Sequence, residues 1–335
     1  MAEKKPTKLK LLYINEYLRK NSDEDNPVSA DELIEMLNEQ GIKCERKSIY
    51  SDINTLKDFG IDIDSARLPK TGYCLLSREF ELPELRLLID AVQAANFITP
   101  KKTKELIRKI GTLCSEKQKN NLEGQVYIEN RVKCANEEIY YYIDKIHRAI
   151  SQNRQISFIY SKRAVNEKCD GIMYHEKEHC VSPYAMIWSN DHYYLVGNTE
   201  KYNNLMHLRI DRMKKVEITD KPSRSFTEVS PYKLSFDSAD YSSKTFNMFS
   251  GDTQRIEIVC HNSILEEILD RFGSDVTLRR SEVPDCFELM AKCSISDGLV
   301  SWLMQFGSKV EVVTPKSLRF DISKRAKEIL EVYNR

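Results

Sequence analysis

The stretch SPYAMIWSNDHYYLVGNTEKYNNLMHLRIDRMKK, residues 182 to 215, determines how the middle of the chain folds. Residues 184–188 and 192–196 are rich in aromatic and β-branched side chains, which favours two strands. Residues 189–191 between them are turn formers, so the two strands form a hairpin. Two further strands are expected, one at residues 205–210 and one beginning at Val216.

Basic residues follow the third of these strands. Arg209 and Arg212 flank Asp211, and Lys214 and Lys215 come directly afterwards. Aromatic rings can stack on a base and guanidinium groups can bind phosphate, so this pattern suits an anionic ligand that carries a base. The alternative is that the tyrosines pack a small barrel while the arginines are solvated or pair with Asp211 or another acid.

The same stretch resembles the central domain of the WYL-domain transcriptional regulators. The resemblance lies in Tyr193-Tyr194-Leu195, where the family has Trp first, and in LRIDRM at residues 208–213. It implies an Sm-like or SH3-like β-barrel over residues 136–221, which senses a nucleotide or a single-stranded nucleic acid. The implied ligand residues are Tyr160, Tyr193, Arg209 and Arg212, with His179 at the rim. His179 replaces an arginine that the family tends to place four residues before the proline matched by Pro183.

Residues 1–77 have the pattern of a winged helix-turn-helix. Leu9, Leu12, Tyr13 and Tyr17 share one face of a first helix, and Ser29 with Glu32 forms the capping box of a second. A third helix begins near Glu45, with its apolar residues Ile49, Ile53 and Leu56 on one face. The short apolar runs 61–63 and 72–75 then predict a β-hairpin.

The third helix is the predicted DNA reader. Residues 46–56, RKSIYSDINTL, resemble the family's DNA-binding helix, although Ser51 stands where the family often has Arg. Polar and basic side chains on its outer face can donate to bases and phosphates in the major groove, and the hairpin can contact the backbone. The alternative is a solvated helix face. The predicted DNA-binding residues are Arg46, Lys47, Ser48, Tyr50, Ser51, Asn54, Lys57, Arg67 and Lys70.

Residues 78–135 are expected to form a helical linker, with helices beginning at Pro83 and Pro100. Residues 101–109, KKTKELIRK, carry five basic residues and one acid. This run could touch a DNA backbone, but a charge run of this kind is more typical of a solvated helix face.

The segment His175-Glu176-Lys177-Glu178-His179 matches the HExxH signature of zinc proteases. That chemistry requires both histidines on one continuous helix, whereas this segment lies between two predicted strands and favours a charged hairpin. A structural zinc held by Cys169, His175, His179 and Cys180 fits no common ligand spacing. We therefore expect no enzyme, no metal and no cofactor. The alternatives are a zinc hydrolase that uses His175 and His179, or a nucleic-acid-binding accessory factor without promoter specificity.

Residues 222–251 are a connecting segment, and residues 252–335 form a C-terminal domain. Its predicted order of elements, βαββαβ, is that of a ferredoxin-like sandwich. LDRFG at 269–273 and SWLMQFG at 301–307 resemble the C-terminal extension of the WYL family, which implies a homodimer. The expected fold class is thus α+β and multidomain.

Composition sets outer bounds on function. The 51 basic and 51 acidic residues balance, which argues against a chain coated with polyanion but permits local basic patches. No apolar run is long enough to span a membrane, and the nine cysteines lack a secretory context. The sequence thus predicts a cytoplasmic bacterial transcription regulator that binds double-stranded promoter DNA and no membrane.

Overall fold

The computed structural model covers residues 1–335 and describes 9–66, 70–124, 133–168, 171–230, 241, 246, 248–249, 251–274 and 276–335. The chain divides into two compact units, Met1–Ala135 and Asn136–Arg335. Each unit has hydrophobic cores of its own. None of the described helices is both long enough and apolar enough to cross a bilayer.

The first unit begins with three helices and a hairpin, as predicted. The hairpin strands pair antiparallel, and Ile49, Ile53 and Leu56 are buried in the core. The elements are α1 (Leu9–Asn21), α2 (Ala30–Glu39), α3 (Arg46–Asp58), β1 (Ile63–Ala66) and β2 (Gly72–Leu75). The capping box of α2 is confirmed: the Glu32 amide donates to Ser29 Oγ at 3.2 Å, and the Ser29 amide donates to the Glu32 carboxylate at 2.7 Å.

The apolar face predicted for α1 is only partly correct: Tyr13 and Tyr17 are partly buried and pack against the core, but Leu12 does not lie on the buried side. Leu12 is 64% exposed, and the buried positions are Lys10, Ile14 and Leu18, spaced four residues apart. Lys10 occupies a core-facing position because its ammonium group is paired with Asp52 of α3. A prediction from apolar residues alone assigns lysine to solvent, so it selected a neighbouring stripe of the helix.

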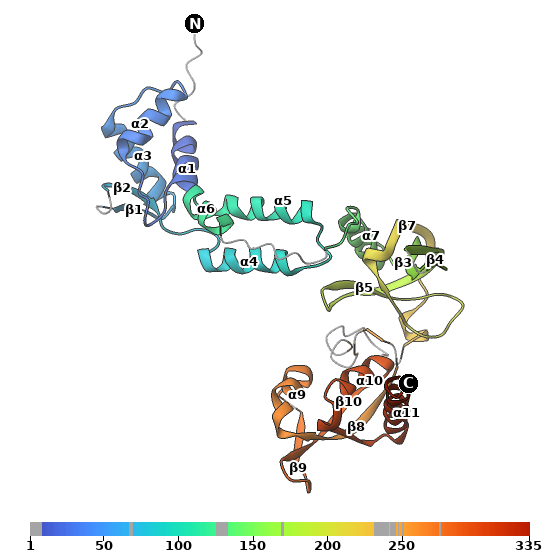
Figure 1. The fold of residues 1–335 in the computed structure, drawn as a ribbon. Helices are drawn as coiled ribbons and strands as arrows, with labels where there is room; N and C mark the ends of the chain where they lie inside the picture. Colours follow the sequence, from blue (N-terminus) through green and yellow to red (C-terminus); the bar gives the residue numbers. More distant parts are fainter. Residues whose placement is uncertain are drawn as a thin grey trace. The chain divides into compact units, whose positions relative to one another are not determined.

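The predicted linker is a packed helical segment. Its core consists of Leu85, Ile89, Ile107, Cys114 and Leu122. Its elements are α4 (Leu82–Ala94), α5 (Pro100–Ile110), a 3-10 turn (Gly111–Leu113) and α6 (Glu116–Gly124). Helices α4 and α5 lie side by side (Figure 1).

A helix and five strands begin the second unit. They are α7 (Ile139–Ser151), β3 (Arg154–Val165), β4 (Ile172–Ser189), β5 (His192–Asn198), β6 (Met206–Arg209) and β7 (Met213–Pro222). All pairings are antiparallel, in the order β6-β5-β4-β3-β7. The predicted turn between β4 and β5 is confirmed, and both Asn190 and Asp191 have positive φ, as in a type I′ hairpin.

The described strands do not close into a barrel, which corrects the predicted closed topology. The outermost strands β6 and β7 are joined by the 3-10 turn Ile210–Arg212, yet no ladder pairs them in the described part of the chain. Strand β6 has only four residues, and the strand that pairs with β7 is β3. The sheet is therefore open, and its Sm-like or SH3-like assignment stays a prediction.

The last part of the second unit has the predicted order of elements. They are β8 (Asp252–His261), α9 (Leu265–Phe272), β9 (Thr277–Arg280), β10 (Cys286–Ile295), α10 (Asp297–Met304), β11 (Val310–Thr314) and α11 (Lys316–Tyr333). The antiparallel sheet has the order β11-β8-β10-β9. Trp302 packs against the core of this sheet, in contact with Phe246, Phe272 and Phe306. The ferredoxin-like assignment stays a prediction.

Candidate functional site

Helix α3 has one buried face and one face open to solvent. The exposed side carries six of the predicted DNA-binding residues, namely Arg46, Lys47, Tyr50, Ser51, Asn54 and Lys57. The seventh predicted residue on this helix, Ser48, is only half-exposed. A helix with this division can lie in a groove and offer donors to it without disturbing its own packing.

A polar contact inside the unit fixes the orientation of α3. The ammonium group of Lys10, which is 4% exposed, forms an ion pair with Asp52 and donates to Ser48 Oγ. Ser48 is therefore engaged towards α1. A buried charge is tolerated only when it is paired and hydrogen-bonded, so this contact selects one rotational setting of α3 against α1.

Two of the predicted DNA-binding residues, Arg67 and Lys70, come from the hairpin. Arg67 lies outside the described residues. Lys70 donates to both carboxylate oxygens of Glu32, at 2.8 and 2.9 Å. Partial burial of Glu32 opposes ionisation, but hydrogen bonds from Lys70 and Ser29 prevail and lower its pKa to about 2. Lys70 can contact DNA only by leaving Glu32 or by sharing its charge.

The second site lies where β6 ends. The guanidinium of Arg209 forms a fork with Asp211, with Nε–Oδ1 at 3.0 Å and Nη2–Oδ2 at 2.7 Å. Both side chains are largely buried, with 24% and 16% of their surfaces exposed. Burial alone would raise the pKa of Asp211, but the bond to Arg209 lowers it. Arg209 is thus committed to Asp211, which was the alternative left open by the sequence.

Tyr160 joins this cluster from β3. Its hydroxyl accepts a hydrogen bond from the Arg209 amide at 3.2 Å, and its ring is 5% exposed. Burial raises the pKa of Tyr160, and hydrogen bonding from the Arg209 amide and the Arg212 side chain offsets part of that rise. Arg212 itself is exposed. Arg212 is therefore more accessible to a ligand than Arg209, although its side chain is also hydrogen-bonded to the Tyr160 hydroxyl.

His179 lies next to Tyr160 on the same sheet. Its ring stacks on Phe158 with centroids 5.7 Å apart and meets Tyr160 edge-on at 6.0 Å. Burial lowers the pKa of His179, and Lys177 and Lys162 lower it further. A cavity of about 490 Å³ opens here, lined by Ser157, Phe158, Ile159, Glu178, His179, Cys180 and Lys215.

Tyr193 is not brought to Arg209. It pairs across the hairpin with Trp188, and the two rings stack with centroids 5.8 Å apart. Successive side chains of a strand point to opposite faces, and Tyr194 is the residue directly opposite Arg209. Neither Tyr194 nor His192, two positions earlier, was predicted from the sequence. Strand alternation places His192 and Tyr194 on one face of β5. The sequence did not show that Arg209 of β6 lies opposite Tyr194.

The HEKEH segment lies in strand β4. His175 is opposite Lys162, and His179 is opposite Phe158, in a continuous ladder with β3. Two residues four positions apart on a strand are about 13 Å apart, whereas zinc-protease histidines lie one helical turn apart. Glu176 accepts a hydrogen bond from Lys214 at 2.5 Å. The backbone therefore does not have the geometry that HExxH chemistry requires.

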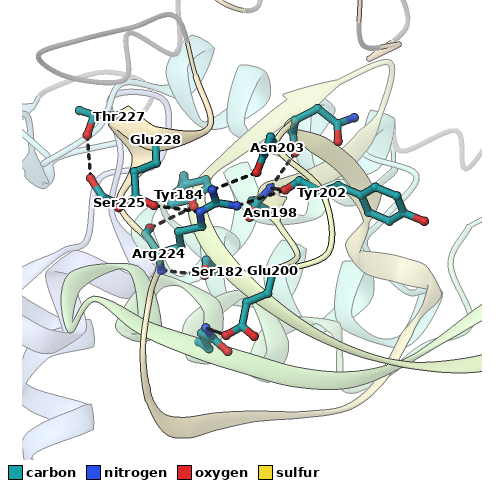
Figure 2. Close-up of polar contacts among 12 residues, drawn as sticks. Ser182, Tyr184, Asn198, Glu200, Tyr202, Asn203, Arg224, Ser225, Thr227 and Glu228 are labelled. Atoms are coloured by element: carbon teal, nitrogen blue, oxygen red, sulfur yellow. Dashed lines mark hydrogen bonds and ion pairs between the residues drawn. The ribbon is translucent and has the colours of Figure 1, made fainter.

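Arg224, in the segment after β7, is a further arginine whose side chain is hydrogen-bonded within the fold. Its side chain donates to Glu228 Oε2 at 3.0 Å, to the Tyr202 carbonyl at 3.3 Å and to Asn203 Oδ1 at 3.0 Å (Figure 2). Its amide donates to Ser182 Oγ at 2.9 Å. These bonds hold the guanidinium against the loop after β5, so we assign Arg224 to fixing this loop and not to ligand binding.

Comparison with protein families identifies two domains. The WYL domain matches residues 141–218, and the WCX domain matches residues 254–330. This chain is therefore a WYL-domain protein with a C-terminal WCX domain, which confirms the resemblance drawn from the sequence. A comparison with curated proteins finds no match.

Two solved structures are similar to the chain at a low level. One is proteasome accessory factor B/C (PafBC) of Arthrobacter aurescens, with a TM-score of 0.26 and 16% identity over 95% of this chain and 46% of that one. This chain thus spans about half the length of that protein. The other is a CRISPR Cas-related protein, with a TM-score of 0.38 and 15% identity over 76% of this chain and 73% of that one. Likenesses at this level carry no argument about function.

Proposed function

We propose that this protein is a DNA-binding transcriptional regulator that reads promoter DNA with α3 and senses a ligand through its WYL domain. The observation that carries the proposal is the outer face of α3, where six polar or basic side chains are exposed above a buried apolar face. Arginine and lysine can bind guanine edges or phosphates, and Asn54 can bind an adenine edge. The buried contact of Lys10 with Asp52 holds this face in one orientation.

The arrangement of the first unit supports a winged helix-turn-helix. In that motif the third helix enters the major groove, and the hairpin approaches the neighbouring backbone. Strands β1 and β2 would supply the wing, with Lys70 at its base. We extend the proposal to a homodimer in the bacterial cytoplasm, since an operator with two half-sites requires two copies of the reading helix.

The proposed effector is a nucleotide or a short single-stranded nucleic acid. Arg212 offers an exposed cation, and the His179 ring lines a cavity together with Phe158 and Lys215. Arg209 can bind a phosphate only in competition with Asp211. The site therefore favours ligands that engage Arg212 first and place a base against the His179 ring, because Tyr160 is too deeply buried to stack on a base.

We also propose that the HEKEH segment has no catalytic role and that the protein is not an enzyme. What supports this is the strand conformation of residues 172–180, which keeps His175 and His179 apart. The zinc hydrolase would require this strand to refold into a helix.

The proposal is tested by selecting genomic fragments with the purified full-length protein. We expect enrichment of a discrete sequence, with binding that survives excess non-cognate duplex. Asn54→Ala should relax the selected sequence at one position, whereas Lys324→Ala, an exposed residue of α11, should leave it unchanged. Enrichment of no sequence above random fragments would favour the accessory factor and contradict promoter recognition.

Ligand sensing is tested separately. Labelled nucleotides and short single-stranded oligonucleotides are titrated against wild type and Arg212→Ala at two salt concentrations. We expect weaker binding by the variant, with a larger difference at low salt. Equal affinity of both proteins would remove Arg212 from the site.

A further inference from the structure

Helix α5 carries a concentration of positive charge in a chain that is neutral as a whole. Its eleven residues include five basic side chains and one acid, Glu105. The inner face of the helix is formed by Thr103 and Ile107, which are 1% and 7% exposed. The basic residues therefore occupy the rest of the helix circumference.

The structure divides the five cations into two groups. Lys102 and Lys109 both pair with Glu105, at 2.9 and 2.7 Å. Hydrogen bonds from these two lysines lower the pKa of Glu105 to about 2, so its charge is present throughout the neutral range. Lys101, Lys104 and Arg108 have no ion pair with any described residue, and all three are exposed.

The three unpaired cations form one stripe. At about 100° per residue, positions 101, 104 and 108 fall within about 60° of each other, and Glu105 with its lysines lies to one side of them. The stripe is about 10 Å long at 1.5 Å of rise per residue. That length matches about three successive phosphates of one DNA strand, which rise 3.4 Å each along the duplex axis.

The stripe belongs to the same compact unit as α3. Asp23, between α1 and α2, is 3% exposed and accepts a hydrogen bond from Ser115, which is fully buried before α6. The Arg78 guanidinium donates to the Ser22 carbonyl at 2.7 Å. These contacts fasten the segment that carries α5 to the three-helix part, so the position of its charges is defined relative to the reading helix.

We propose that the stripe of Lys101, Lys104 and Arg108 binds the phosphodiester backbone of duplex DNA outside the base pairs that α3 reads. This inference rests on the proposed function and adds a second, sequence-independent contact to it. An acidic protein surface is the other partner that such a stripe would fit. Backbone DNA is favoured because the unit already presents a DNA-reading face and the stripe lacks apolar side chains, which protein interfaces place at their centre.

The test measures operator affinity of the full-length protein between about 50 and 200 mM salt. The variant is Lys101→Gln/Lys104→Gln/Arg108→Gln, in which glutamine keeps helix propensity nearly unchanged. A charge-matched control is Lys316→Gln/Lys324→Gln/Lys327→Gln on α11, and a control on the same helix is Lys102→Gln/Lys109→Gln. Each protein is measured on a duplex trimmed to the selected site and on one with long flanks.

On the long duplex, losing three phosphate contacts should make the slope of log affinity against log salt shallower by about 2.7. The ratio of wild-type affinity to variant affinity should then fall about 40-fold as the salt concentration rises across this fourfold range. Both controls should keep most of the wild-type slope, and wild type and variant should converge on the trimmed duplex.

Equal slopes for wild type and the variant on the long duplex would overturn the inference, and so would an equal loss in the α11 control. Unchanged DNA binding together with lost regulation in a reconstituted transcription assay would also overturn it, in favour of an acidic protein partner. Failure of wild type to bind any duplex would instead refute the proposed function.

Discussion

The outer face of α3 and the arginine cluster after β6 were both predicted as binding sites from their basic residues. In the structure the two sets of charges differ in burial and in pairing. On α3, Lys47 and Lys57 are exposed, and Arg46 reaches only the largely exposed Asp31, at 3.6 Å. After β6, Arg209 and Asp211 are mostly buried and joined by two short hydrogen bonds. The first set of charges is exposed to a partner, with only a long, solvent-exposed ion pair at Arg46, whereas the second is buried within the fold.

This difference separates binding from stability. Removing an exposed side chain changes what the protein can touch and leaves its core intact, whereas removing half of a buried pair leaves the other half desolvated without compensation. Substitutions on α3 should therefore act on DNA binding, and substitutions in the buried pairs should act on the free energy of unfolding.

The largest effect is expected at the buried pair that supports α3. Lys10→Ala leaves Asp52 without its partner and should lower the free energy of unfolding by about 3–5 kcal/mol. Thermal or urea denaturation measures this change. Lys10→Met/Asp52→Leu, which removes both charges, should recover most of the loss, and a Lys10→Ala protein as stable as wild type would show that the pair is not buried in solution.

Arg209→Ala should come next. Because Asp211 loses two charge-assisted hydrogen bonds, we expect a loss of about 1.5–3 kcal/mol in the free energy of unfolding. The matched variant is Arg212→Ala, which removes an exposed arginine three positions away. It costs the Tyr160 hydroxyl one hydrogen bond, so it should lower the free energy of unfolding by less than Arg209→Ala does. If Arg212→Ala destabilises as much as Arg209→Ala, the distinction between the buried Arg209 and the exposed Arg212 fails.

Substitutions on α3 should show the opposite pattern: operator binding should weaken while stability stays unchanged. Asn54→Ala and Lys47→Ala should each keep the wild-type melting temperature, because both side chains are exposed. Loss of a base contact should weaken operator binding by about 1–3 kcal/mol, and loss of a phosphate contact should weaken binding to all sequences alike. Fluorescence anisotropy with cognate and scrambled duplexes distinguishes the two, and wild-type binding by both variants would mean that another element reads the operator.

A smaller effect of defined pH dependence is expected at Glu32. Its pKa of about 2 in the folded protein is below that of an unfolded glutamate, about 4.3. Its contribution to stability is therefore full above about pH 4.3 and is lost as the pH falls towards 2. The side chain is 41% exposed, so the advantage over Glu32→Gln should stay below about 1 kcal/mol.

Melting temperatures of both proteins between pH 7 and pH 2 measure the Glu32 effect. The two curves should converge at the acid end. A constant difference at all pH values would mean that the carboxylate charge of Glu32 does not contribute.

The smallest effect is expected at Glu176 in the HEKEH segment. It forms an ion pair with Lys214 in which the two side chains are 42% and 54% exposed, so Glu176→Gln should change stability by less than about 0.5 kcal/mol. DNA binding should be unchanged. Peptide hydrolysis by wild type that is lost in Glu176→Gln would overturn the proposal that the segment has no catalytic role.

Local sequence determined the elements and their order. The helix of residues 46–58 could be predicted because its apolar residues recur at helical spacing, and the capping box of α2 could be predicted because Ser29 and Glu32 stand three positions apart. The turn at Asn190 and Asp191 likewise follows from residues that adopt positive φ readily. These features depend on neighbours within a few positions, which a sequence displays directly.

Only the tertiary structure decided which charges are paired and which faces meet. Lys10 pairs with Asp52, forty-two positions away, and the buried stripe of α1 includes Lys10 and not Leu12. The register of β5 with β6 placed Tyr194, and not Tyr193, opposite Arg209. A pairing partner distant in sequence and the face of a strand are set by how elements pack, because a shift of one residue in register reverses every side chain of the strand.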